Sequence, residues 1–262
     1  MKRQSWHRSL ACLGAAAALS FVVGAQPAAA AEDVGVQMER EYGVVDRDTR
    51  EGARMNDVLD EVCDRIVRGV NQQPKRKRFR LKSARLLGGR AEKTDKVINA
   101  FALPDGRIYV TLGLMRAIED SPRMEDELGF VVGHEVTHVV EKHGKGQSQK
   151  ATQAGILAIV LGAVTKSDVV GQVAGVGAQA YVSSYSRKDE YRADKGGLEA
   201  MNAAGYDTDA AATMLSRLKS AGENNRINAL FASHPGTENR IKRVREMSRD
   251  LKSGRDIPNQ ER

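Results

Sequence analysis

The strongest constraint in this sequence is a pair of histidines four residues apart, His134 and His138, in the stretch VVGHEVTHVVEKHG. Residues four apart lie on one face of an α-helix, one turn above the other. Two such imidazoles can bind one zinc ion, and Glu135 lies beside them, where its carboxylate can reach water without being a ligand. The flanking apolar residues predict a buried helix, in which paired histidines without a metal would be costly. We therefore expect a domain built around a buried metal-binding helix.

A third histidine, His143, follows in the same stretch. If the helix continued, its side chain would be turned by about 180° from His134 and about 140° from His138, so it could not share their metal. The longer H-E-x-x-H-x-x-G-x-x-H pattern also fails, because it has glycine and histidine where this chain has Glu141 and Gly144. Contact with the helix dipole before Gly144 explains His143 more simply than a functional role does.

The third metal ligand has to come from another part of the chain, and the stretch SRKDEYRADKGGLEAM contains candidates. Glu190 and Asp194 are four residues apart on an expected helix. A glutamate there could complete the metal shell, while Asp194 could hydrogen-bond a ligand histidine from behind. Asp189 is a neighbouring candidate, and the pattern by itself is weak, because any charged helix produces it.

The rest of the chain predicts a mainly helical α+β fold with a small antiparallel sheet or hairpin packed against the metal-site helices. Apolar residues at three-and-four spacing predict a helix within residues 49–71. Two β-rich runs, 97–103 and 107–111, flank Pro104-Asp-Gly106, which is typical of a hairpin turn. Further helices are expected from about Leu114, from Ser121-Pro122 to Gly144, and three times between residues 186 and 251.

The first thirty residues differ in composition from the rest of the chain. A basic start without acids, an apolar run over 10–25 and small residues behind it predict a secretory signal peptide over residues 1–31, cleaved after Ala30 or Ala31. An uncleaved N-terminal anchor is the alternative. Cleavage would lower the formal net charge from +7 to +4 and leave Cys63 as the single cysteine, so no intramolecular disulfide is expected.

Beyond the signal peptide we expect a loosely held helical arm (32–48), one domain (49–251) and a flexible tail (252–262). The basic run 75–80 is interpreted as a solvated loop and strand edge, and the low aromatic content of 5% gives no reason to expect a nucleic-acid partner. The Gly- and Ala-rich segment 154–182 predicts a buried or surface-docked helical pair, because its apolar piece is too short to span a bilayer. Peripheral membrane contact through it is the alternative.

Three pieces of the sequence together resemble a known family. They are His134-Glu-Val-Thr-His138, Glu190-Tyr-Arg-Ala-Asp194 and the SHPGTENRI of residues 233–241. With the hairpin NAFALPDGRIYVTLGL, they are similar to the HtpX-like and CAAX-prenyl-protease-like zinc metallopeptidases of metallopeptidase family forty-eight, over roughly residues 50–250. The chain looks most similar to the short, exported, single-domain bacterial members.

The resemblance implies a gluzincin-type endopeptidase with a zincin-like fold and one Zn²⁺ per chain. It implies His134, His138 and Glu190 as zinc ligands and Glu135 as the general base and acid. It also places His234 and Arg240 near the zinc, at the oxyanion or the fourth coordination position. The substrate would add as a strand to the sheet edge formed by Asn99, Ala100, Phe101 and Ala102. Expected substrates are unfolded or misassembled proteins of the periplasm or cell envelope of a bacterium, or of the medium if the protein is secreted.

Other functions stay open at this stage. One is a zinc-containing, chaperone-like or latent peptide-binding protein with little turnover, and another is a membrane-surface adaptor with a structural metal. A structural zinc site would have four protein ligands and no use for a carboxylate beside them, so Glu135 favours catalysis. A regulated enzyme is harder to dismiss, because His234 as a fourth ligand could block the open position.

Overall fold

The structure is a computed structural model that describes residues 33–74, 76–143, 185–223, 227–230, 234 and 237–258. The chain divides into two compact units, Met1–Glu32 and Asp33–Arg262, and all described residues belong to the second. The predicted signal peptide and the segment 154–182 therefore lie outside the described residues. Among the helices that are described, none combines the length and the apolar character needed to cross a membrane.

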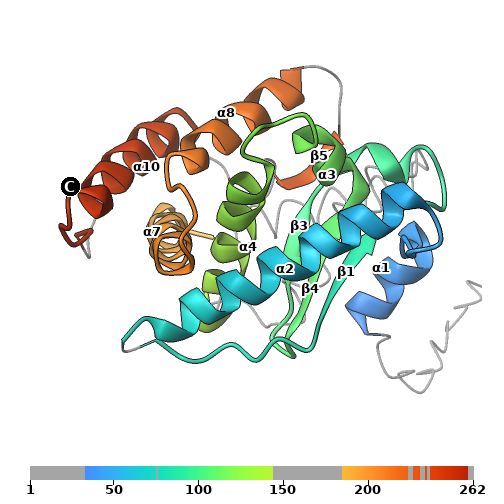
Figure 1. Ribbon diagram of the computed structural model, residues 1–262, viewed down its shortest axis with the longest axis horizontal. Helices are drawn as coiled ribbons and strands as arrows, with labels where there is room; N and C mark the ends of the chain where they lie inside the picture. The colour runs from blue at the N-terminus through green and yellow to red at the C-terminus, as the bar shows by residue number, and fades with distance from the viewer. Residues whose placement is uncertain are drawn as a thin grey trace, which may run out of the picture. The chain divides into compact units, whose positions relative to one another are not determined.

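Helices make up most of the described chain, as Figure 1 shows. They are α1 (Val34–Tyr42), α2 (Arg50–Gln72), α3 (Leu112–Ile118), α4 (Met124–Val140), α7 (Arg187–Ala204), α8 (Ala210–Glu223) and α10 (Thr237–Lys252). The strands are β1 (Ser83–Leu87), β2 (Val97–Ile98), β3 (Ala100–Ala102), β4 (Arg107–Thr111) and β5 (Ile227–Asn228), with a 3₁₀ turn at Thr94–Lys96. The predicted mainly helical α+β class is confirmed.

The predicted hairpin is present, but the sheet around it is mixed. Strand β3 pairs antiparallel with β4, with Phe101 opposite Tyr109. Strand β1 pairs parallel with β4 on its other side, which gives the order β1-β4-β3 and corrects the expectation of a wholly antiparallel sheet. The connection 88–106 is long enough for the chain to return and run in the same direction beside β1. Strands β2 and β5 form a separate parallel pair.

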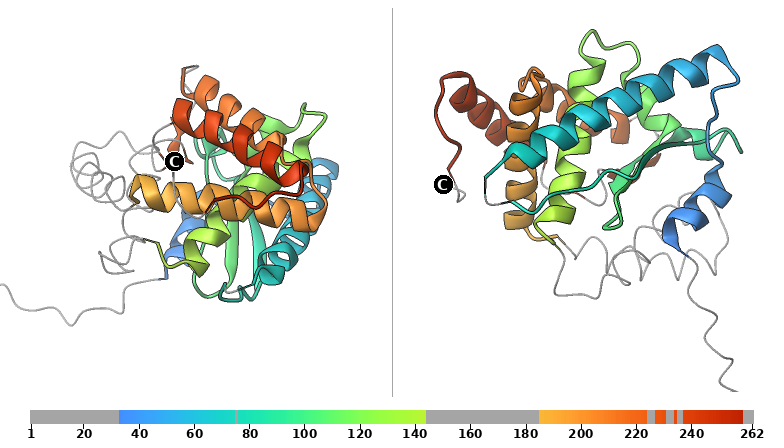
Figure 2. Two further views of the ribbon diagram at one scale, coloured as in Figure 1. Left: turned by 90° about the vertical axis from the view of Figure 1, so that its left-hand side faces the viewer. Right: turned by 60° about the horizontal axis from the view of Figure 1, so that its bottom comes forward.

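Helix α4 is buried on nearly every side. It packs against α2, α7, α8 and strand β3, and the views in Figure 2 agree with this central position. Every residue from Glu127 to His138 in α4 is buried. A helix surrounded in this way is apolar around its whole circumference, so the few polar side chains it carries must find partners inside the protein.

Helices α4 and α7 cross at two glycines, Gly133 and Gly197. A Cβ atom on Gly133 would lie 3.0 Å from the Cα atom of Gly197, and one on Gly197 would lie 3.1 Å from the backbone nitrogen of His134. The absence of side chains at this crossing lets the two helix backbones approach closely. Glu190, two turns before Gly197 on α7, thereby comes within reach of the histidines on α4.

We expect Gly133→Ala to lower the free energy of unfolding by about 1–3 kcal/mol, because the added methyl group meets the backbone of α7. Gly129→Ala is the matched control on the same helix, since its Cβ atom would meet side chains and not backbone: the end of Ile66 at 3.3 Å and the ring of Tyr206 at 3.4 Å. The control should be neutral or gain up to about 1 kcal/mol from helix propensity. Urea denaturation of both variants measures the difference, and equal stabilities would contradict the close-crossing explanation.

Two segments expected to be loosely held are packed in the structure. In the N-terminal arm, Met38 and Tyr42 on α1 are fully buried in an apolar cluster that includes Phe101. In the C-terminal tail, Ile257 is buried, and its carbonyl oxygen accepts a hydrogen bond from Lys195 Nζ at 2.9 Å. Both segments are polar overall, but a few apolar side chains in each are enough to hold them.

The basic run is also more integrated than a solvated loop. Arg76 is largely buried and pairs with Glu141 at the end of α4 (3.2 Å) and with Glu199 on α7 (3.1 Å). Phe79 in the same run is buried in the main core. One cation of this run therefore ties α4 to α7, which the charge pattern alone did not indicate.

Candidate metal centre and active site

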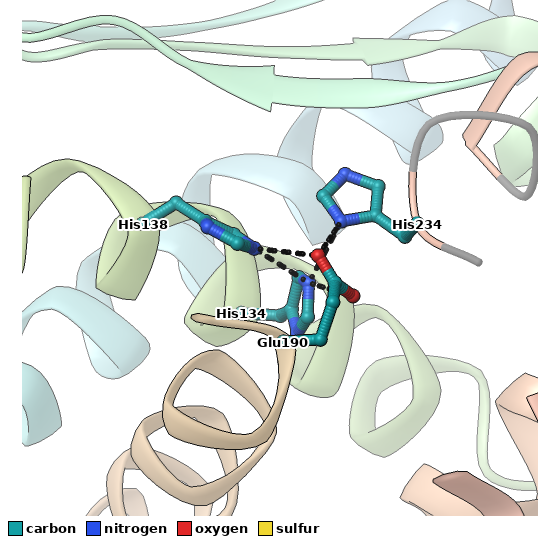
Figure 3. A group of neighbouring side chains, drawn as sticks. All are labelled: His134, His138, Glu190 and His234. Carbon is teal, nitrogen blue, oxygen red and sulfur yellow. Dashed lines mark hydrogen bonds and ion pairs between the residues drawn. The ribbon is translucent and has the colours of Figure 1, made fainter. Parts of the chain in front are cut away.

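Four side chains from three parts of the chain converge in the interior, as Figure 3 shows. His134 and His138 come from α4, Glu190 comes from the first turn of α7, and His234 comes from the connection that precedes α10. One ligand atom from each residue lies within 4.8 Å of all the others, and all four residues are buried. The sequence predicted the first three as ligands and placed His234 beside them.

The spacing of these atoms suits a small tetrahedral ion. His134 Nε2 lies 3.0 Å from His138 Nε2 and 3.2 Å from His234 Nδ1, and His138 Nε2 lies 3.4 Å from Glu190 Oε1. Zinc–ligand bonds of 2.0–2.1 Å in a tetrahedron place the ligand atoms roughly 3.3 Å apart. The observed separations fall around this value.

The contacts behind His134 show which of its nitrogens is available to a metal. Its Nδ1 atom lies 3.0 Å from Oδ1 of Asp194, which is fully buried. A carboxylate accepts hydrogen bonds, so the ring proton belongs on Nδ1 and the lone pair of Nε2 points toward His138. Two imidazole nitrogens that face each other at 3.0 Å are stabilised when a cation lies between them. The donor set therefore fits a metal ion.

Unsatisfied polar atoms at the same place support this fit. Within the described chain, Glu135 Oε1, Glu190 Oε2 and His234 Nε2 are buried and make no hydrogen bond. Glu190 Oε2 does form an ion pair with Arg240 Nη1 at 2.9 Å, and Glu135 Oε1 lies 3.3 Å from His234 Nε2. Buried polar atoms are normally hydrogen-bonded, so a group of unpaired ones beside a ligand cluster is typical of a site that binds an ion or a substrate.

Glu135 is next to the cluster but is not one of its ligands. Burial raises the pKa of its carboxyl group above the ordinary value, although the nearby His234 and His138 act in the opposite direction. Burial also opposes the charge on Glu190, but His234 and Arg240 hold the pKa of Glu190 well below its ordinary value. The two glutamates thus differ in their environments: Glu190 is held as an anion, and Glu135 is closer to exchanging a proton.

Arg240 lies behind the ligands, and its donors are engaged. Its Nε and Nη2 atoms donate to the two carboxylate oxygens of Asp194 at 3.0 and 2.7 Å. Its Nη1 atom donates to the carbonyl oxygen of His234 at 3.0 Å and pairs with Glu190. Arg240 therefore holds three residues of the site in place, and its expected position at the oxyanion or the fourth coordination position stays a prediction.

A pocket adjoins Glu135 and His234. Apolar side chains from α4, α8 and the segment after β5 form most of its wall. It is lined by Phe130, Val131, His134, Glu135, Leu215, Leu218, Leu230, His234 and Arg240. Glu135 and His234 thus lie at the edge of an apolar recess, where electrostatic interactions are stronger than in water.

The predicted substrate edge, Asn99–Ala102, lies on β3, the outer strand of the three-stranded sheet within the described residues. The backbone carbonyl oxygen of Asn99 accepts a hydrogen bond from Thr111 N, and Leu103 N donates to the carbonyl oxygen of Arg107, so every second residue of this edge is bonded to the β4 side. This alternation directs the backbone groups of Ala100 and Ala102 away from β4. The N–H group of Ala100 donates a hydrogen bond to Asn99 Oδ1 at 3.0 Å. The carbonyl group of Ala100 and the backbone N–H and carbonyl groups of Ala102 are then the groups that face outward at this edge.

Asp189, the other carboxylate considered as a ligand, caps α7. Its Oδ2 atom accepts a hydrogen bond from Ser186 N at 3.0 Å, and its own N–H donates to Ser186 Oγ at 3.1 Å. This capping box fixes the first turn of the helix, in which Glu190 is the next residue.

Sequence reasoning missed the position of His143. Helix α4 ends at Val140, earlier than the expected end at Gly144, and the chain then turns back at Lys142. His143 Nδ1 comes to lie 3.0 Å from His138 Nδ1. The expectation assumed a continuing helix, and no local signal marks Lys142 as the turning point.

The peptidase family M48 model matches residues 72–248, and the chain belongs to this family. The predicted resemblance to metallopeptidase family forty-eight is thereby confirmed. Members of the family use zinc, and the four-residue cluster described above fits that ion.

Several relatives carry protease names. The chain is 31% identical to the mitochondrial metalloendopeptidase OMA1 of Schizosaccharomyces pombe over 154 residues, and this matched region is 58% of this chain and 44% of the relative. It is 30% identical over 161 residues to the metalloprotease LoiP of Escherichia coli, covering 59% and 61%. It is 27% identical over 167 residues to the beta-barrel assembly-enhancing protease of the same organism, covering 59% and 33%. The chain thus matches less than two thirds of the length of each of these relatives.

Proposed function

We propose that this protein is a zinc-dependent metalloendopeptidase that hydrolyses peptide bonds. The observation that carries the proposal is the convergence of His134, His138 and Glu190 with a buried carboxylate, Glu135, that is not a ligand. A chaperone or a structural metal site would have no use for Glu135 at this position.

In this proposal His134, His138 and Glu190 hold the metal, and the residues behind them keep them in place. Asp194 accepts the Nδ1 proton of His134, and Arg240 holds both Asp194 and Glu190. Arg240 is then a positioning residue. Zinc, when bound, supplies a Lewis acid for the scissile carbonyl and lowers the pKa of water toward neutrality.

Glu135 moves the proton in the proposed reaction. Its carboxylate takes a proton from the attacking water and passes it to the leaving amine. Its raised pKa supports this role, because a carboxyl group that titrates closer to neutrality can both accept and release a proton. His234, 3.3 Å from Glu135, would donate a hydrogen bond to the oxygen that gains negative charge.

The substrate is proposed to bind as an extended strand along β3. The Ala100 carbonyl and the Ala102 backbone would supply main-chain hydrogen bonds, which tolerate many sequences. A side chain beside the scissile bond would enter the apolar recess lined by Phe130, Leu215 and Leu230. This mode of binding requires an unfolded segment and favours apolar residues, which are the residues that misfolded proteins expose.

We further propose that the substrates are misfolded or misassembled proteins of a bacterial cell envelope. The predicted signal peptide over residues 1–31 supports export to the periplasm, with secretion as the alternative. The relative named a beta-barrel assembly-enhancing protease supports an envelope role.

Metal removal tests the activity directly. Full-length protein treated with a chelator and dialysed should no longer cleave unfolded casein, and zinc, but not magnesium, should restore cleavage at about one ion per chain, because a site rich in imidazole suits zinc. Zinc content and casein fragments are measured on the same samples. Undiminished cleavage by the metal-free protein, or a chain that takes up no zinc, would overturn the proposal.

A further inference from the structure

His143 contacts the Nδ1 atom of His138, on the side of the ring away from the ligand cluster, as Asp194 contacts the Nδ1 atom of His134. Its side chain is only 2% exposed, and its Nδ1 atom lies 3.0 Å from Nδ1 of His138. We infer that His143 is a positioning residue that holds the ring of His138 for metal binding by accepting a hydrogen bond from its Nδ1 atom. The inference rests on the proposed function, because it takes His138 as a metal ligand.

The positions of the ring nitrogens determine where the protons belong. His138 Nε2 faces the cluster, 3.0 Å from His134 Nε2. A neutral histidine that offers the lone pair of Nε2 carries its proton on Nδ1, and that proton needs an acceptor. The Nδ1 atom of His143 is in position to accept, which puts the proton of His143 on Nε2, at 3.8 Å from Asp189 Oδ1. With a metal bound at His138 Nε2, the proton of His138 would lie on Nδ1 and that of His143 on Nε2.

The backbone between the two histidines is a second, independent observation. Lys142 has φ of 55° and is the only residue other than glycine with a positive φ in the described chain. Lys142 N donates to Val139 O at 3.1 Å, and His143 N donates to His138 O at 3.0 Å, which together form a Schellman motif. A lysine in this conformation is strained relative to glycine, and its own side chain is exposed. The turn brings His143 back against His138, where a continuing helix would have directed it away.

A neutral acceptor suits this side of the site. Glu135, Glu190 and Asp194 are already three buried carboxylates around the cluster, with Arg240 as the buried cation among them. A further carboxylate behind His138 would add another desolvated charge without a partner. A neutral imidazole supplies the required lone pair without adding a buried charge.

The test compares three replacements of His143 in the full-length protein. His143→Leu keeps much of the volume and removes the acceptor. His143→Asn places its Oδ1 atom close to the position of the imidazole Nδ1 and keeps the acceptor. His143→Gln is polar but carries its amide one bond farther out, and it replaces the leucine variant should that one fail to fold. Zinc affinity is measured by competition with a chromophoric chelator, and the visible spectrum of the Co²⁺ form reports ligand geometry.

We expect His143→Leu and His143→Gln to bind zinc about 10–100-fold more weakly than the wild type, with an altered Co²⁺ spectrum. His143→Asn should stay within about threefold and keep the wild-type spectrum. Wild-type affinity in His143→Leu and His143→Gln, or equal losses in all three variants, would overturn the inference. These readouts are independent of cleavage: a wild type that binds zinc but does not cleave casein would overturn the proposed function alone.

Discussion

Glu135→Gln is expected to lower kcat/KM for peptide cleavage by about 10²–10⁴-fold, which is the contribution of a positioned general base. The amide keeps the shape of the side chain but cannot take up a proton from water. Glu135 is not among the clustered ligand atoms, so the variant should still bind about one zinc ion per chain. Cleavage of an unfolded protein and zinc content, measured on the same preparation, give the two numbers.

The matched control is Glu125→Gln, which removes a carboxylate from the exposed first turn of the same helix. It should leave cleavage unchanged and cost at most about 1 kcal/mol of stability through the helix dipole. Wild-type cleavage by Glu135→Gln would exclude Glu135 as the base. If Glu135→Gln lost both zinc binding and cleavage, Glu135 would instead be identified as a ligand.

Arg240→Met is expected to lower the free energy of unfolding of the metal-free protein by about 3–5 kcal/mol. Arg240 is buried and binds both oxygens of Asp194 as well as Glu190. Methionine leaves these carboxylates buried with less compensation, and a buried charge that has lost its partner is costly. Chemical denaturation of the chelated wild type and variant measures the loss.

Two further variants separate charge from packing. Arg245→Met removes an exposed arginine from the same helix and should change stability by no more than about 0.5 kcal/mol. The double variant Arg240→Met, Asp194→Asn removes one of the stranded charges and should be more stable than Arg240→Met alone. A double variant that is less stable by the sum of both single losses would show that Arg240 acts through packing and not through charge.

Much of the metal centre could be read from local spacing. An interval of four residues on a helix places two side chains on one face, whatever the rest of the protein does. His134 with His138 and Glu190 with Asp194 are pairs of this kind, and the structure brings the two pairs together at one site. The hairpin could also be predicted from the sequence, because its turn residues and its alternating strands are both local signals.

The sequence by itself determined which side chains share a helix face, where the hairpin turns and which family the chain belongs to, because these depend on short-range periodicity and on motifs. The tertiary structure alone decided how the faces meet. The crossing at Gly133 and Gly197 brings Glu190 to the histidines. Arg240 lies next to the ligands because it pairs with the buried carboxylates of Glu190 and Asp194. His143 reaches His138 only because Lys142 leaves the helical conformation. Such contacts depend on packing between distant segments and on backbone turns that the packed protein stabilises, and no spacing rule along the chain contains them.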